Sequence, residues 1–234
     1  MRQLYIIPIV HTSADLGLLE TQISEVKQLR FSKEAIEEGK KRINHFWIDL
    51  RDSIEAWALD YSQLLVFQDA LPTVGQLPAR LKQEASFQEG LELRIVRDLA
   101  SKGSPNHQLL LWLSEQGATI VGTESPELLV MEYEIIRKSL VQAIDRSDGD
   151  HEMEIELASL LLRRDRFIAN RIEESLNEGQ SAVLFIGMLH DVARWLPDDM
   201  TVDFPFGRPV HHQLQRPASL PATVSTSTVS HTED

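Results

Sequence analysis

Four short, uninterrupted runs of apolar residues constrain the fold of this chain more than any other feature. They are Leu4–Val10, Leu64–Phe67, Ala118–Val121 and Ala182–Ile186. Strands that alternate apolar and polar residues have one face in water, whereas continuous apolar runs are typical of strands covered on both faces. A fifth, weaker run, Met200–Phe206, contains Pro205 and is interpreted as an edge strand or a loop. The runs predict a mostly parallel central sheet.

Helical patterns lie between these runs. Ser32 is a suitable N-cap for a long helix to about Leu59, and Ser125-Pro126-Glu127 is a strong start signal for a helix to about Ile144. A further helix is predicted at 89–99, stopped near Gly103 and Pro105, and others at 107–116 and 152–177. Strands alternating with helices predict an α/β fold whose sheet is covered by helices on both faces.

We expect a single domain over residues 1–209, with a helical insertion at about 30–60. Residues 210–234 are dominated by Pro, Ser and Thr, and they are predicted to form a disordered tail. The long final helix has a buried stripe through Leu161, Ile168 and Ile172, which places Arg164 and Asp165 at its edge and points Arg166 elsewhere.

Charge and composition exclude several function classes. The formal net charge is −13, with 23 basic against 36 acidic residues, which argues against nucleic acid and anionic membranes as partners. The chain has no cysteine, so thiolate zinc sites and cysteine nucleophiles are excluded. The N-terminal apolar run contains Pro8 and stops at His11, and no run approaches the ~18 apolar residues of a membrane span. We expect a cytoplasmic protein.

The residues that follow the strands are the candidates for chemistry. The first strand leads to His11, the second to Asp69, the third to Glu124 and the fourth to His190. In a parallel sheet, ligands bind outside the carboxyl ends of the strands, so these four side chains would meet at one edge. The alternative is that strand ends are polar simply because loops meet water.

The two histidines at strand ends are the more informative pair. A single histidine there would more often be a hydrogen-bonded structural residue, but two with nearby carboxylates indicate a metal site or a general acid–base pair. His45, His107 and His151 are interpreted as surface or capping residues. A buried charge needs a partner, so Arg164 and Asp165 either form a local structural ion pair or reach the polar sheet edge.

The chain also resembles the TraB and TIKI family. His11-Thr12-Ser13 after the first strand is similar to the G-x-x-H-x-S opening of that family, residues 164–169 are similar to its R-[DN]-x-x-[MI] helix motif, and Gly187-x-x-His190 is similar to its second G-x-x-H. Pro8 stands where the first motif has glycine. The resemblance covers roughly residues 4–196. It implies an α/β fold related to TIKI-type metal-dependent proteases and erythromycin-esterase-like hydrolases.

The leading hypothesis is a hydrolase of amide or ester bonds. Its expected site residues are His11, Asp69, Glu124, Arg164, Asp165 and His190. Of these, His11, Glu124 and His190 would bind Mn²⁺, Co²⁺ or Zn²⁺, or would polarise a water molecule. The expected partner is a peptide or a small molecule, and a homodimer fits the sequence as well.

Two alternatives remain open. One is a module on the same scaffold that binds a peptide or small molecule without turnover. The other is an interaction protein that acts through the helix 32–59, whose Phe46, Trp47 and Trp57 would face a partner unless they cover the sheet.

Overall fold

The computed structural model describes residues 1–10, 20–73, 90–145 and 151–208. Within them the chain forms an α/β fold with a five-stranded parallel sheet, six α-helices and two 3-10 turns. The strands are β1 (Arg2–Ile9), β2 (Leu64–Gln68), β3 (Thr119–Val121), β4 (Ser181–Gly187) and β5 (Met200–Asp203). The helices are α1 (Glu20–Arg30), α2 (Lys33–Ala56), α4 (Leu91–Ser101), α5 (Pro105–Glu115), α6 (Pro126–Asp145) and α7 (His151–Ser175). The 3-10 turns are η3 (Tyr61–Gln63) and η5 (Val192–Trp195).

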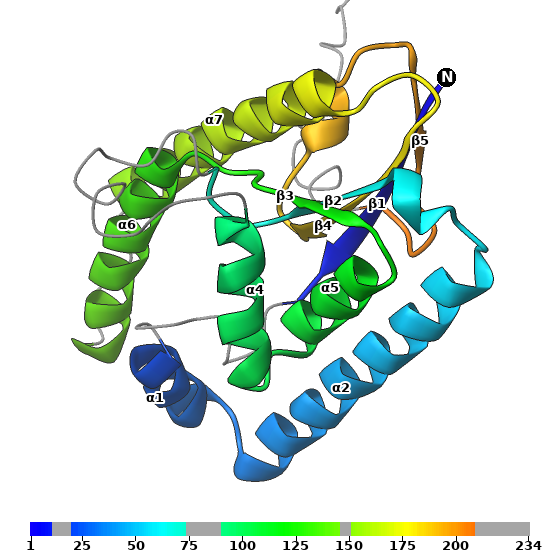
Figure 1. Ribbon diagram of the computed structural model, residues 1–234. Coiled ribbons are helices and arrows are strands. Elements are labelled where there is room, and N and C mark those ends of the chain that lie inside the picture. The colour runs from blue at the N-terminus through cyan, green and yellow to red at the C-terminus, as the bar shows by residue number, and fades with distance from the viewer. Residues whose placement is uncertain (11–19, 74–89, 146–150, 209–234) are drawn as a thin grey trace, which may run out of the picture.

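The sheet has the strand order β3-β2-β4-β1-β5, and every pairing is parallel. From β1 to β2 to β3 the chain moves across the sheet in one direction, and it reverses from β3 to β4. Crossover connections between parallel strands are right-handed, so a reversal of direction moves the connecting helices to the opposite face. This explains why α2, α4 and α5 cover one face of the sheet while α7 covers the other (Figure 1).

Each face of the sheet has its own apolar core. The core under α2 and α5 contains Ile7, Val66 and Phe185, and the core under α7 contains Ile6, Phe67 and Leu184. Consecutive strand residues point to opposite faces of the sheet. When both faces are buried, every position of the strand is apolar, and the sequence shows no alternation of apolar and polar residues. The predicted continuous apolar runs are confirmed as strands, and the fifth run forms the edge strand β5.

The aromatic residues of α2 cover the sheet. Trp47 is buried in the core, the ring of Trp57 stacks on Tyr5 with centroids 5.0 Å apart, and Phe46 lies edge-on to Phe206. Phe46 and Trp57 are half-buried and pack against the same core. These contacts favour the alternative that the aromatic side chains cover the sheet.

Three local predictions need correction. Helix α5 begins at Pro105, with the Ser104 hydroxyl accepting from the His107 N–H at 3.2 Å, whereas we predicted a helix stop there and a start at His107. The pair Ser104-Pro105 has the same N-cap signature as Ser125-Pro126. His107 is consequently buried in the first turn rather than on the surface, and its Nδ1 lies 2.8 Å from the Ser104 hydroxyl. The third correction is α1, which was not predicted.

Other expectations hold or lie beyond the described residues. The helix 32–59 is confirmed as α2 with Ser32 as its N-cap, and His45 and His151 are exposed. Among the described residues, no helix combines the length and the hydrophobicity that a membrane span requires. His11, Ser13 and the tail 210–234 lie outside the described residues.

Gly122, directly after β3, is held against the chain that follows β2. A Cβ added to Gly122 would lie 2.6 Å from the Pro72 carbonyl oxygen and 2.8 Å from the Thr73 Cα, so the backbone would have to move. We predict that Gly122→Ala lowers the free energy of unfolding by about 2 kcal/mol or more. Gly39→Ala in α2 is the control, because nothing lies within 4 Å of its added Cβ and alanine favours helix by up to ~1 kcal/mol. Chemical denaturation measures both, and equal stabilities of the two variants would contradict the prediction.

Candidate active site

Five of the six predicted site residues form one buried cluster at the carboxyl edge of the sheet, on the α7 face. They are Asp69, Glu124, Arg164, Asp165 and His190, and each is at most 5% exposed. The sixth predicted residue, His11, lies outside the described residues. β1, the strand that precedes His11, ends at Ile9 beside Gly187 of β4.

Asp69 is fixed by both its backbone and its side chain. Its N–H donates to the Phe185 carbonyl of β4 at 2.9 Å, and its Oδ2 accepts from the Gly187 N–H at 2.8 Å. The next residue, Ala70, has φ 62°, in the left-handed region that costs energy for any residue with a Cβ. This turn comes directly after Asp69, the first residue beyond β2, and leaves the Asp69 carboxylate at the strand end.

Glu124 is fixed because the segments after β2 and β3 stay paired beyond the strands. The Glu124 N–H donates to the Leu71 carbonyl at 2.9 Å, and the Glu124 carbonyl accepts from the Thr73 N–H at 2.8 Å. The close approach at Gly122 makes this pairing possible. The Glu124 side chain is completely buried.

Arg164 joins the carboxylates. Its Nη2 donates to Glu124 Oε1 at 2.5 Å and to Asp69 Oδ1 at 2.8 Å, and its Nε donates to Glu124 Oε2 at 3.1 Å. Its Nη1 donates to Glu132 of α6. Burial alone would lower the pKa of Arg164, but Glu124 and Asp69 raise that pKa above its ordinary value, so the guanidinium stays charged.

Glu132 is the cluster residue that sequence reasoning missed. It lies on α6 and its side chain is 28% exposed, the most exposed of the groups around Arg164. No motif or strand end marks this position, and Glu127 and Glu134 nearby are equally acidic. Only the packing of α6 against α7 singles it out.

His190 is held by Asp165 from the same helix as Arg164. Its Nδ1 lies 2.5 Å from Asp165 Oδ1, and Asp165 Oδ2 accepts from the Asp191 N–H at 3.0 Å. Its Nε2 faces Asp69 Oδ2 at 3.6 Å, longer than an ordinary hydrogen bond. Burial alone would lower the pKa of His190, but the Asp69 charge and the bond to Asp165 outweigh it and raise the pKa.

Arg164 and Asp165 thus reach the polar sheet edge, while Arg166 points away, over the Trp195 ring.

The cluster carries more negative than positive charge. Among the described residues, four carboxylates face one guanidinium and one imidazole. Burial raises the pKa of Glu124 to about 7, even though Arg164 lowers it. Buried negative charge without enough positive charge beside it costs free energy. Protonation of a carboxylate or binding of a cation would reduce that cost.

Asp69, Glu124 and His190 could hold a metal ion. Each offers one donor atom, and the three donors lie within 4.8 Å of one another. The donors Nε2 and Oδ2, 3.6 Å apart, can both reach an ion at bond lengths of about 2.1 Å. Carboxylate oxygens have more than one lone pair, so the bonds from Arg164 leave capacity for a cation. With Nε2 as the metal-binding atom, the ring Nδ1–H donates to Asp165, which is the usual outer contact of a metal-binding histidine.

Removing the Arg164 charge should leave the buried carboxylates uncompensated. We predict that Arg164→Met lowers the free energy of unfolding by about 3–5 kcal/mol at neutral pH, with a smaller loss near pH 5 where the carboxylates can take up protons. Arg166→Met, two residues along the same helix and exposed, should cost less than about 1 kcal/mol. Urea denaturation of both variants tests this, and a similar small loss in each would refute it.

The raised pKa of Glu124 should make the metal-free protein less stable as pH rises. In the unfolded chain Glu124 loses its proton near pH 4.5, and in the folded chain near pH 7, so folding takes up a proton between these values. We expect a fall in the free energy of unfolding on the order of 2 kcal/mol across this window, continued by His190, whose contribution is lost as pH rises through its raised pKa.

Glu124→Gln should remove the Glu124 part of this fall, because glutamine does not titrate. The measurement is denaturant unfolding of both proteins in chelator-treated buffer from pH 4 to pH 8. Parallel stability curves for the two proteins would show that Glu124 titrates normally.

Comparisons with protein-family models, with curated proteins and with solved structures give no match to this chain. The resemblance to the TraB and TIKI family therefore rests on the sequence motifs and stays a prediction. What the cluster can do follows from its own chemistry.

Proposed function

We propose that this chain is a hydrolase of amide or ester bonds whose reaction centre is the Asp69, Glu124, His190 group. The observation that carries the proposal is the pair of carboxylates around the His190 imidazole. Asp165 holds the Nδ1 side of the ring, and Asp69 faces its Nε2 side. The motif resemblance to TIKI-type proteases points to the same chemistry.

Each residue of the site would have a distinct role. Asp165 holds Nδ1–H, so that His190, at a pH above its raised pKa, presents the Nε2 lone pair toward Asp69. Arg164 keeps the Asp69 and Glu124 carboxylates in place. With Mn²⁺, Co²⁺ or Zn²⁺ bound to Asp69, Glu124 and His190, the ion would supply a water molecule of lowered pKa and would polarise the substrate carbonyl. Without an ion, His190 itself would take the proton from water.

A binding module without turnover is the second candidate. The specific observation in its favour is burial: the five cluster residues have almost no exposed surface, and Arg164 bonds to both oxygens of Glu124. Such a closed cluster would respond to a ligand by a change in shape or stability. Stabilisation by peptides in a thermal shift assay, with no product formed, would favour this candidate.

We predict that chelator-treated protein binds one divalent ion per chain and that His190→Ala abolishes the binding. Asp165→Asn should weaken it by about 10–100-fold, because it removes the partner that orients the imidazole. Binding should strengthen as pH rises, since His190 and Glu124 must lose their protons to act as ligands. Isothermal titration calorimetry with Mn²⁺, Co²⁺ and Zn²⁺ measures all three effects.

The same variants test the hydrolase. Hydrolysis of p-nitrophenyl acetate and of an amino-acid p-nitroanilide should require His190, and His11→Ala tests the predicted ligand outside the described residues. His45→Ala, which replaces an exposed histidine on α2, is the control histidine variant. Metal binding that survives His190→Ala, together with unchanged hydrolysis, would rule out this centre.

A further inference from the structure

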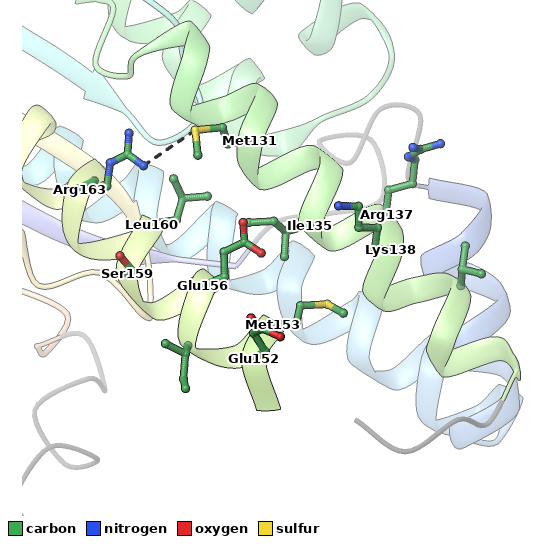
Figure 2. Close-up of a pocket in the computed structure, with 12 residues that line it drawn as sticks. Met131, Ile135, Arg137, Lys138, Glu152, Met153, Glu156, Ser159, Leu160 and Arg163 are labelled. Carbon is green, nitrogen blue, oxygen red and sulfur yellow. Dashed lines mark hydrogen bonds between the residues drawn. The ribbon is translucent and has the colours of Figure 1, made fainter. Parts of the chain in front are cut away.

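Helices α6 and α7 enclose a groove of about 950 Å³ that is separate from the buried cluster. Figure 2 shows its two walls, with Ile135 on α6 and Met153 and Leu160 on α7 between the helices. A small core of Leu128, Ile135 and Leu160 closes the floor. Beyond this floor the two helices leave apolar surface in solvent.

The rims of the groove expose large apolar side chains. Val141 on α6 is 51% exposed and Ile155 on α7 is 59% exposed, and both line the groove. Large exposed apolar side chains that line one groove, as these two do, are a sign of a docking surface for another molecule.

The charges on the two walls have opposite signs. The α6 wall carries Arg137 and Lys138, while the N-terminal half of α7 carries Glu152 and Glu156, with Arg163 farther along the same helix. Among the residues that the structure describes, no ion pair joins Glu156 to Arg137 or Lys138 across the groove. Arg137 pairs instead with Glu134 of its own helix, an exposed contact of little strength.

This distribution is self-complementary. In a two-fold symmetric pair, each surface meets a copy of itself, so a basic wall on one copy can face the acidic wall of the other, and the contact occurs twice. We propose that the occupant of the groove is a second copy of this chain. The α7 helix of each copy lies along the α6 wall of its partner, with Glu156 facing Lys138 and Ile155 covering Val141.

Charge reversal tests this arrangement directly. Lys138→Glu and Glu156→Lys should each weaken the dimer by about tenfold or more, because both symmetric contacts become repulsive at once. An equal mixture of the two variants should form a heterodimer as tight as the wild type, because each acidic wall then faces a basic one. Sedimentation velocity over a wide range of protein concentration measures the dissociation constants.

Arg42→Glu, an exposed reversal on α2, is the control and should leave the dimer unchanged. A wild-type protein that stays monomeric at every concentration would overturn the proposal and leave the groove to a different partner. A dimer that neither reversal weakens, or that the mixture does not restore, would overturn it as well. Circular dichroism of each variant confirms that the helices are intact.

Discussion

The buried guanidinium of Arg164 is the interaction on which the arrangement of this site depends. It contacts Asp69 after β2, Glu124 after β3 and Glu132 on α6, so one side chain connects four elements that are distant in the sequence. A buried ionic cluster gives little net stability over apolar side chains of equal volume, although breaking it is costly. Stability alone is therefore a poor reason for these charges, and a role in positioning or chemistry is the better one.

The topology of the sheet explains why the cluster forms where it does. Because the chain reverses direction between β3 and β4, α7 lies on the face opposite α5 and places residues 164 and 165 over the strand ends. The reversal also inserts β4 next to β2, which brings Gly187 and His190 to Asp69. In open parallel sheets such a change of direction is where ligands bind.

Much of this could be predicted because burial leaves a strong signal in sequence. The strands are covered on both faces and read as apolar runs, and Asp69, Glu124 and His190 follow them directly. Arg164 and Asp165 were detectable because a charge at the edge of a buried helical stripe must have a partner. The ion pairs themselves required coordinates, since the order of strands decides which ends are neighbours.

The missed features have weaker signals. Helix α1 is mostly exposed and polar, so no apolar stripe marks it. Ser104-Pro105 can either stop one helix or cap the next, and sequence alone favoured the first reading. Glu132 looks like any exposed acidic residue of α6, because only tertiary packing brings it to Arg164.

The groove and the cluster share their two helices. Met131 and Arg163 contact each other at the groove, and the next residue on each helix, Glu132 and Arg164, forms the ion pair of the cluster. A shift of α6 along α7 would therefore change the Glu132–Arg164 contact first, and the strands of the sheet only afterwards. A second copy that fixes the two helices would hold Arg164 and, through it, Asp69 and Glu124. By linkage, any such effect is reciprocal: cation binding at these carboxylates would change the affinity of the dimer by the same factor.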